Sequence, residues 1–166
     1  LSGMEAWQFL IGVGFSQVLV GLIAIFLTLA AATSLGFELR GSILSFLLIT
    51  VLTSISMVAF SLILAAVTRS VTDVLVVGNF PLFLFMFFSG AAFPLSPKAW
   101  FYLGDYGVSW QSLMSPAPAI SALQKISIMG VGLDDIQGEL LALTLMTAIY
   151  FAIGLWGFQR RHLSTK

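Results

Sequence analysis

The chain alternates between long hydrophobic runs and short polar junctions. Four runs contain no Asp, Glu, Lys, Arg or His and extend over residues 8–32, 42–67, 74–95 and 140–158. A helix that crosses a bilayer needs about 20 mostly apolar residues. Helices are expected because an open set of strands would leave backbone groups unpaired in lipid. The pattern therefore predicts an all-α integral membrane protein with four transmembrane helices, in one transmembrane domain over residues 1–166.

A longer and more polar segment separates the third and fourth runs. Residues 96–139 include Pro116 and Pro118 and four of the seven acidic residues, so we expect this outer region to lie mainly outside the hydrocarbon. Residues 100–102 are aromatic, which suits the headgroup level of a membrane. Residues 119–129 have an apolar and a polar side but are too few to span. They predict a short re-entrant or interfacial helix before the last span.

Composition agrees with a membrane class and excludes several others. Hydrophobic residues make up 59% of the chain and charged residues only 8%, with mean hydropathy +1.06 and formal net charge +0. The usual charged share is about 25%. Too few charges are present to cover the surface of a soluble domain. A nucleic-acid binder is excluded as well, because it would need a basic excess.

The residues required for catalysis or metal binding are scarce. The chain has no Cys and one His, so thiolate chemistry and a zinc site built from several imidazoles are excluded and we expect no metal site. The spans hold no acid–base group, and no glycine-rich loop of the Walker type is present. We therefore expect no enzymatic activity and no ATP binding by that motif in this chain.

Polar side chains inside the spans are the candidates for a substrate pathway. They are Gln17 in the first run, Thr50 and Ser54 in the second, and Asn79 in the third. The first three belong to stripes of small and polar residues at helical spacing, which are typical of helix–helix contacts. The hydroxyl groups of Thr50 and Ser54 can also bond a carbonyl one turn back. Asn79 lies two residues before Pro81, so its amide can serve the proline kink, a neighbouring helix or a cavity.

Charged residues at the ends of the runs predict the orientation. Four crossings place both termini on one side of the membrane, and the Arg160–Arg161 pair flanks the last run. Lys and Arg near span ends mark the cytoplasmic side. We therefore expect both termini in the cytoplasm. Arg69 and Asp73, four residues apart at the membrane boundary, are expected to form a solvated ion pair.

Several short motifs, taken in order, resemble the permease of type-two ABC transporters, the membrane half of many bacterial exporters. The motif positions are Ser89, Gly90, Phe93 and Pro94 after the third run, and Pro116 before the short helix. Phe88 and Gln124–Lys125 depart from the Leu and Leu-Arg that the family usually shows. Two other stretches support the match: Ala65-Ala66-Val67-Thr68-Arg69-Ser70 and Asn79-Phe80-Pro81-Leu82.

The resemblance implies a six-helix ABC exporter permease, of which this chain holds the third to sixth spans. The first two spans and most of the coupling helix expected before Trp7 would then be missing. A second permease copy, in a homo- or heterodimer, and a cytoplasmic ABC ATPase subunit are the implied partners, besides the lipid bilayer. ATP and Mg would bind that ATPase, so this chain itself needs no cofactor. The implied location is the inner (plasma) membrane, which the chain crosses several times.

Two functions remain open at this point. The first is an ATP-driven exporter whose substrate passes between two permease units, with an amphipathic or apolar substrate favoured by the uncharged pathway residues. The alternative is a polytopic membrane scaffold or assembly subunit that binds partner helices through its small-residue stripes and has no transport activity.

Overall fold

The computed structural model describes residues 6–68, 70–93, 98–114 and 116–162, and the account below is limited to them. Its helices and strands are, in chain order, α1 (Ala6–Ser34), α2 (Ile43–Val67), α3 (Val71–Phe88), β1 (Phe101–Leu103), β2 (Tyr106–Val108), α4 (Pro116–Gln124) and α5 (Gln137–His162). A π-helical segment (Lys125–Met129) continues α4, and two 3₁₀ turns cover Trp110–Leu113 and Asp134–Ile136.

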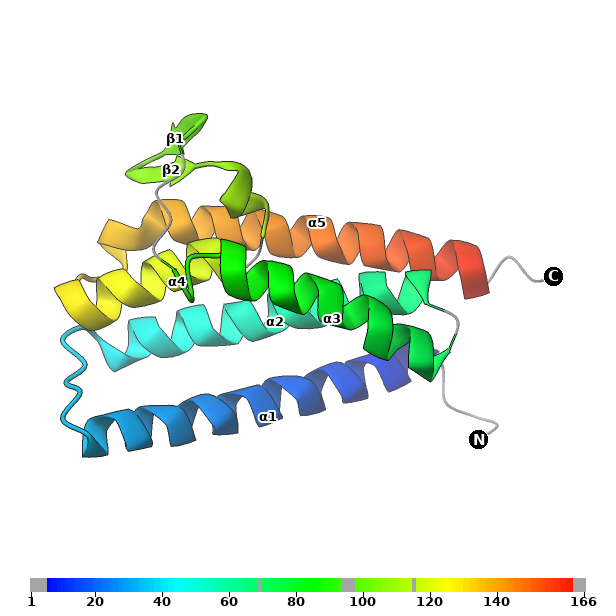
Figure 1. Ribbon diagram of the computed structural model, residues 1–166, viewed down its shortest axis with the longest axis horizontal. Helices are drawn as coiled ribbons and strands as arrows, with labels where there is room; N and C mark the ends of the chain where they lie inside the picture. Colours follow the sequence, from blue (N-terminus) through cyan, green and yellow to red (C-terminus); the bar gives the residue numbers. More distant parts are fainter. Residues whose placement is uncertain (1–5, 69, 94–97, 115, 163–166) are drawn as a thin grey trace.

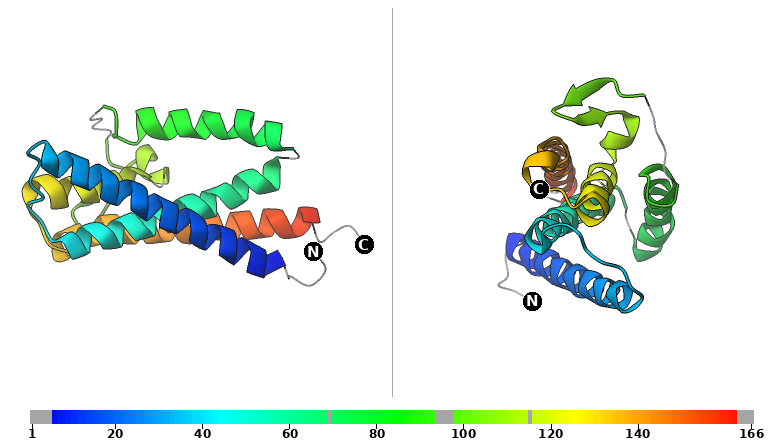
Figure 2. Two further views of the ribbon diagram at one scale, coloured as in Figure 1. Left: turned by 90° about the horizontal axis from the view of Figure 1, so that it is seen from below. Right: turned by 90° about the vertical axis from the view of Figure 1, so that its left-hand side faces the viewer.

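The long helices run roughly side by side, with α2 in the middle. Helix α5 packs along α2, α1 crosses α2 on another side, and α3 lies at the edge, where it contacts α2 and α4 (Figures 1 and 2). The start of α1 and the end of α5 are found at the same end of the bundle. The α1–α2 loop, the π-helical segment and the hairpin lie at the opposite end. This is the up-and-down order that four consecutive crossings require.

Three of the helices are long and apolar enough to cross a membrane by length and composition. They cover Gly12–Ser34, Ile43–Val67 and Asp134–Gly157. The third predicted span, 74–95, corresponds to a helix that ends earlier than expected. Helix α3 begins three residues earlier, at Val71, but ends at Phe88, and its 18 residues extend about 27 Å at the usual rise per residue.

Helix α3 ends early because of its own sequence. The Ser89 hydroxyl donates a hydrogen bond to the Phe85 carbonyl, and Gly90 has φ +88°. A left-handed residue after the last turn reverses the chain, and glycine accepts that conformation without strain. At the other end, Ser70 and Asp73 form a reciprocal capping box. Asp73 therefore has a structural partner in Ser70, while Arg69 lies outside the described residues.

A small antiparallel hairpin is the one departure from the all-helical expectation in the described part of the outer region. Phe101 pairs with Val108 and Leu103 with Tyr106, and Gly104 takes φ +60° in the two-residue turn. Trp100, Phe101 and Tyr102 are all exposed there. The hairpin lies beside the bundle, towards the end that carries the α1–α2 loop (Figure 1), and a headgroup-level position of its aromatic residues stays a prediction.

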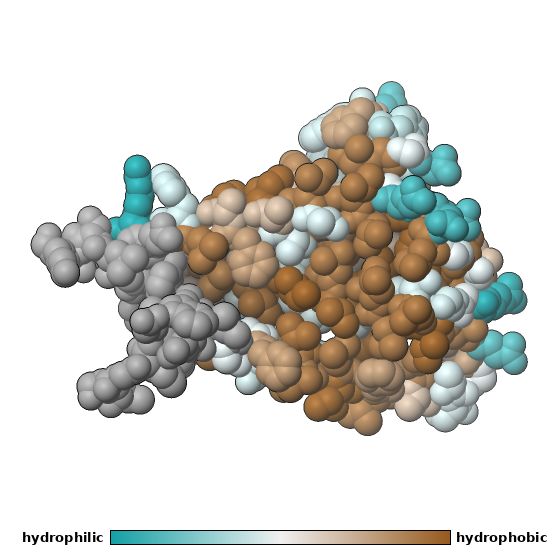
Figure 3. Space-filling view, turned by 180° about the vertical axis from the view of Figure 1, so that it is seen from behind, coloured by the Kyte–Doolittle hydropathy of each residue, from teal (hydrophilic) through white to brown (hydrophobic). Residues whose placement is uncertain are grey.

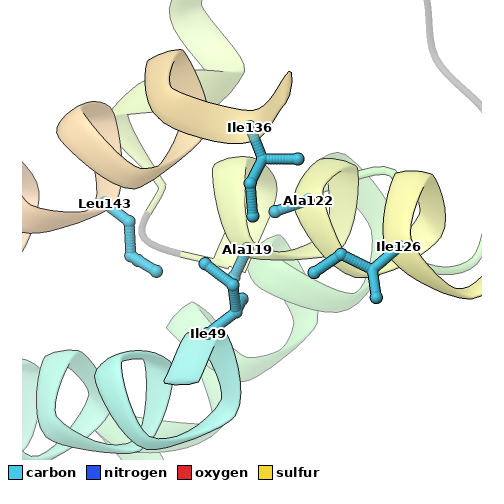
Figure 4. Close-up of a cluster of buried hydrophobic side chains, with 6 residues drawn as sticks. All are labelled: Ile49, Ala119, Ala122, Ile126, Ile136 and Leu143. Carbon is cyan, nitrogen blue, oxygen red and sulfur yellow. The ribbon is translucent and has the colours of Figure 1, made fainter. Parts of the chain in front are cut away.

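Helix α4 confirms the short helix predicted before the last span, and it is inserted into the bundle. Its apolar face carries Ala119 and Ala122, and the π-helical segment continues this face with Ile126. These side chains pack against Ile49 of α2 and against Ile136 and Leu143 near the start of α5 (Figure 4). These side chains are almost fully buried. Pro116 begins the helix, where a missing backbone N–H costs nothing. The cluster is the main hydrophobic core of the described chain.

The outer surface of the bundle is apolar along its middle. Figure 3 shows hydrophobic residues covering the central part of one face and hydrophilic residues gathered towards the ends. Many large apolar side chains of α1 and α3 are exposed, including Phe15, Leu27, Leu75 and Phe80. An apolar band between polar ends is what a lipid bilayer covers.

Two glycines allow α5 to pack closely on α2. A Cβ atom added at Gly154 would lie 2.9 Å from the Leu62 Cβ, and one at Gly157 would lie 3.0 Å from the Ala66 Cβ. Small residues at a membrane helix interface let the two backbones approach. Gly154 and Gly157, three residues apart in the second half of α5, are therefore packing residues, a role that the polar-residue pattern did not single out.

We predict that Gly154→Ala lowers the stability of the protein and that Gly12→Ala does not. Both replacements raise helix propensity by about 1 kcal/mol. Position 12 has no atom within 4 Å of the added methyl group, whereas position 154 meets α2. Overpacking costs about 1–3 kcal/mol, so the thermal unfolding midpoint in detergent should fall for Gly154→Ala and hold or rise for Gly12→Ala. A fall of equal size in both variants would contradict the close α2–α5 contact.

Candidate functional site

A cavity of about 400 Å³ lies between α1 and α2, and α4 contributes one wall residue. Three of the four predicted pathway residues line it: Gln17 from α1 and Thr50 and Ser54 from α2. The other lining residues are Gly21, Ile25, Thr53, Met57, Val58 and Leu123. The cavity is thus mainly apolar, with hydroxyl and amide groups concentrated on α1 and α2.

The spacing of small residues on α1 creates this arrangement. Gly14 and Gly21 are two helical turns apart and face α2, where an added Cβ would come within 3.2 Å of Val58 Cγ1 and 3.4 Å of Ser54 Oγ, respectively. The helix–helix contact expected for this stripe is confirmed at both positions. At Gly21 the missing side chain also leaves space next to the Ser54 hydroxyl.

The hydroxyl groups of the cavity differ in their hydrogen bonds. Thr53 donates to the Ile49 carbonyl at 2.6 Å, and Ser54 donates to the Thr50 carbonyl at 2.9 Å. These are bonds to a carbonyl one turn back, one of the two alternatives that the sequence left open. The Thr50 hydroxyl is different: it is fully buried and has no hydrogen-bond partner among the described residues.

Asn79 does not join the other three candidates. Its Nδ2 donates to the Leu75 carbonyl at 2.6 Å on α3, and the residue is exposed at the edge of the bundle. Pro81 has no N–H to donate to the Val77 carbonyl, so the kink leaves that carbonyl without its usual helical donor. Asn79 does not replace this donor, because it bonds the Leu75 carbonyl one turn back. The amide is thus paired within its own helix. A pathway role for Asn79 stays a prediction.

The described motif positions lie at and just after the end of α3 and at the start of α4. Ser89 and Gly90 terminate α3, and Phe93 stacks on Phe87 with ring centroids 6.1 Å apart. Pro116 begins α4. Pro94 lies outside the described residues. The described motif residues therefore shape helix ends and do not contact the cavity.

A buried ion pair lies between the end of α4 and the start of α5. Lys125 Nζ is 2.7 Å from Glu139 Oε1, and the Ser121 hydroxyl donates to the same oxygen at 3.0 Å. The Glu139 side chain is 1% exposed and that of Lys125 is 25% exposed. The sequence places both residues in the outer region 96–139, with Lys125 in the predicted short helix 119–129, and does not predict their contact. The sequence does contain one indication: Ser121 and Lys125 are four residues apart, a spacing that places both side chains on the same face of a helix.

Tyr106 of the hairpin lies close to this pair. Burial raises the pKa of Tyr106, a hydrogen bond with Ser112 at 2.9 Å lowers it, and the charge of Glu139 raises it, with a net upward shift. The hairpin approaches the backbone of α5 at Gly138, where an added Cβ would meet the Leu103 carbonyl. Glycine at this position therefore lets the hairpin lie directly on the start of α5.

The fold and the cavity define a class: a multi-span helical membrane protein with a mainly apolar, uncharged hollow between its helices. A family model described as ABC-2 family transporter protein matches residues 1–156. The chain belongs to this transporter family, and the resemblance found in its motifs is confirmed. No curated protein and no solved structure matches the chain.

We predict that Thr50→Val stabilises the protein. The replacement keeps the shape of the side chain and removes a buried hydroxyl that has no partner among the described residues. Such a group costs about 1–3 kcal/mol, so a rise of about 1 kcal/mol in unfolding free energy is expected. Thr53→Val is the matched control, since it removes a bonded hydroxyl and should bring no gain. Equal effects of the two variants would contradict the difference in bonding.

We predict a pH dependence of stability that comes from Tyr106. Because the folded pKa lies above the unfolded one, the contribution of Tyr106 is complete below about pH 10 and declines as the pH rises through the folded pKa. Tyr106→Phe should remove this alkaline loss while lowering neutral-pH stability by about 0.5–1.5 kcal/mol through the lost hydrogen bond. Thermal unfolding midpoints between about pH 8 and pH 11 measure both effects. An unchanged alkaline profile in the variant would assign the loss to another group.

Proposed function

We propose that the chain is the membrane-spanning part of an ATP-driven exporter. In this proposal a cytoplasmic ABC ATPase subunit binds ATP and Mg, and a second permease copy, identical or related, faces this one. ATP binding in the partner reorients the paired permeases and moves a substrate through the membrane. This chain contributes binding surface and conformational change, and no chemical step.

The cavity between α1 and α2 is the observation that carries this proposal. It brings Gln17 of α1 together with Thr50 and Ser54 of α2 within the apolar part of the bundle, although Gln17 is far from the other two in sequence. Ligand sites in proteins are typically concave and mostly apolar, with a few polar groups that fix orientation. The exposed amide of Gln17 and the half-buried hydroxyl of Ser54 are two such groups.

The lining favours an amphipathic or apolar substrate. Its polar groups are hydroxyls and one amide, without a charged side chain, and Ile25, Met57 and Val58 supply apolar surface. A substrate with a strongly charged centre would lose its hydration there without an ionic partner. A hydrocarbon chain with a small hydrogen-bonding group fits both kinds of lining residue.

We propose that the protein lies in the plasma (inner) membrane. The start of α1 and the end of α5 then face the cytoplasm. Arg160 lies over the Trp156 ring at 4.2 Å from its centroid, at the end of α5. Trp and Arg next to each other at a span end are typical membrane-interface anchors, and Arg is enriched on the cytoplasmic side.

We predict that Ser54→Leu blocks transport and Ser16→Leu does not. Both serines donate to a carbonyl one turn back at 2.9 Å, but only Ser54 lines the cavity. The full-length protein would be purified with its ATPase and reconstituted in phosphatidylethanolamine–phosphatidylglycerol vesicles. ATP-dependent movement of an uncharged fluorescent long-chain alcohol across the membrane is the measurement. A loss of about tenfold is expected for Ser54→Leu, equal to about 1.4 kcal/mol of lost stabilisation.

Two results would contradict the proposal in different ways. If no nucleotide-binding subunit accompanies the full-length protein and ATP drives no movement, the scaffold alternative is supported. If ATP drives movement but Ser54→Leu and Ser16→Leu behave alike, the protein is an exporter whose pathway lies outside this cavity.

A further inference from the structure

We propose that Glu139 is a positioning residue of the cavity: by binding Ser121 and Lys125, it fixes the rotation of α4 and so holds Leu123 in the cavity wall. This inference rests on the proposed role of the cavity in transport. It concerns a side chain that does not touch the cavity and belongs to none of the motifs described above.

Helical geometry links the ion pair to the cavity. Ser121 and Lys125 are four residues apart and bind the same carboxylate oxygen, so they lie on one face of α4 and its continuation. Leu123 is two residues from each of them. At about 100° per residue it therefore lies on nearly the opposite face, where it reaches the cavity between α1 and α2.

The ion pair and the Ser121 bond add a directional constraint to the hydrophobic packing of α4. The face that α4 turns to the core carries Ala119 and Ala122, and Ile126 of the π-helical segment continues it (Figure 4). Two charge-assisted bonds to one oxygen are directional and define an angle. The backbone N–H of Arg40 donates to the Ser127 carbonyl at 3.3 Å and holds the far end of the π-helical segment. That bond limits sliding, while the ion pair limits rotation.

The environment of Glu139 suits a permanent contact. The residue is in the first turn of α5, where the helix dipole stabilises a carboxylate. With 1% of the side chain exposed, water competes little for its oxygen atoms. A buried charge that loses its partner is strongly unfavourable, so α4 cannot turn away from α5 without breaking a bond that nothing else in the described chain replaces.

Thiol labelling tests this coupling directly, because the chain contains no Cys. Leu123→Cys and Ile25→Cys each place one thiol in the cavity wall, the first on α4 and the second on α1. Labelling by N-ethylmaleimide would be followed in reconstituted full-length protein with and without Glu139→Gln. We expect Glu139→Gln to raise the labelling rate about tenfold in the Leu123→Cys background and by less than about twofold in the Ile25→Cys background.

Matched variants separate positioning from general loosening. Glu38→Gln makes the same chemical change at an exposed glutamate in the α1–α2 loop and should leave both rates unchanged. Ser121→Ala removes one of the two bonds to Oε1 and should give a smaller rise, which provides a milder variant if Glu139→Gln does not fold. Lys125→Gln should add little once Glu139→Gln is present, because residues acting through one contact are not additive.

Equal acceleration in both cysteine backgrounds, or none in the Leu123→Cys background, would overturn the inference. The assay needs neither ATP nor a transported molecule, so it is independent of the proposed function. If Ser54→Leu leaves transport intact while Glu139→Gln still exposes the Leu123→Cys thiol, the positioning role stands and the cavity's role in transport fails.

Discussion

A bilayer offers no water to satisfy polar groups, and this constraint governs the described structure. Backbone groups are paired within long helices, and the hydroxyls of Thr53, Ser54 and Thr147 donate to carbonyls one turn back. Asn79 does the same with its amide. Where a charge is buried, it has an ionic partner, as Glu139 has in Lys125. The Thr50 hydroxyl and the Gln111 amide nitrogen differ from this background, because each is buried and has no hydrogen-bond partner among the described residues.

Close and loose contacts alternate across the bundle, and α2 takes part in both. On one side Gly154 and Gly157 bring α5 against α2, and α4 closes the core around Ile49. On the other side α1 touches α2 through Gly14 and Gly21 and leaves a hollow between them. Helices α2, α4 and α5 thus form the closely packed part of the described bundle, and α1 joins it through fewer close contacts.

The sequence predicted much of this because hydropathy is a strong signal in membrane proteins. The predicted spans 8–32 and 42–67 agree with α1 and α2 to within two residues. Helix α5 begins three residues before the predicted span 140–158, because its first turn also includes Gln137, Gly138 and Glu139. The hairpin was missed because strands of three residues at a two-residue turn leave almost no periodic pattern. The end of α3 was placed too late, since hydrophobicity continues through residues 91–95 although Gly90 has already reversed the chain.

The amino-acid pattern by itself determined the class of protein, the number of apolar segments, the small-residue stripe of α1 and the motifs of the transporter family. These depend on composition and short-range spacing, which need no knowledge of neighbours. Only the tertiary structure decided that Gln17, Thr50 and Ser54 share a cavity and that Asn79 lies elsewhere. It also decided that Lys125 and Glu139 meet, because the 13 residues between them fold back to bury one charge against the other. Contacts between distant segments are set by how helices pack, and hydropathy carries little information about that packing.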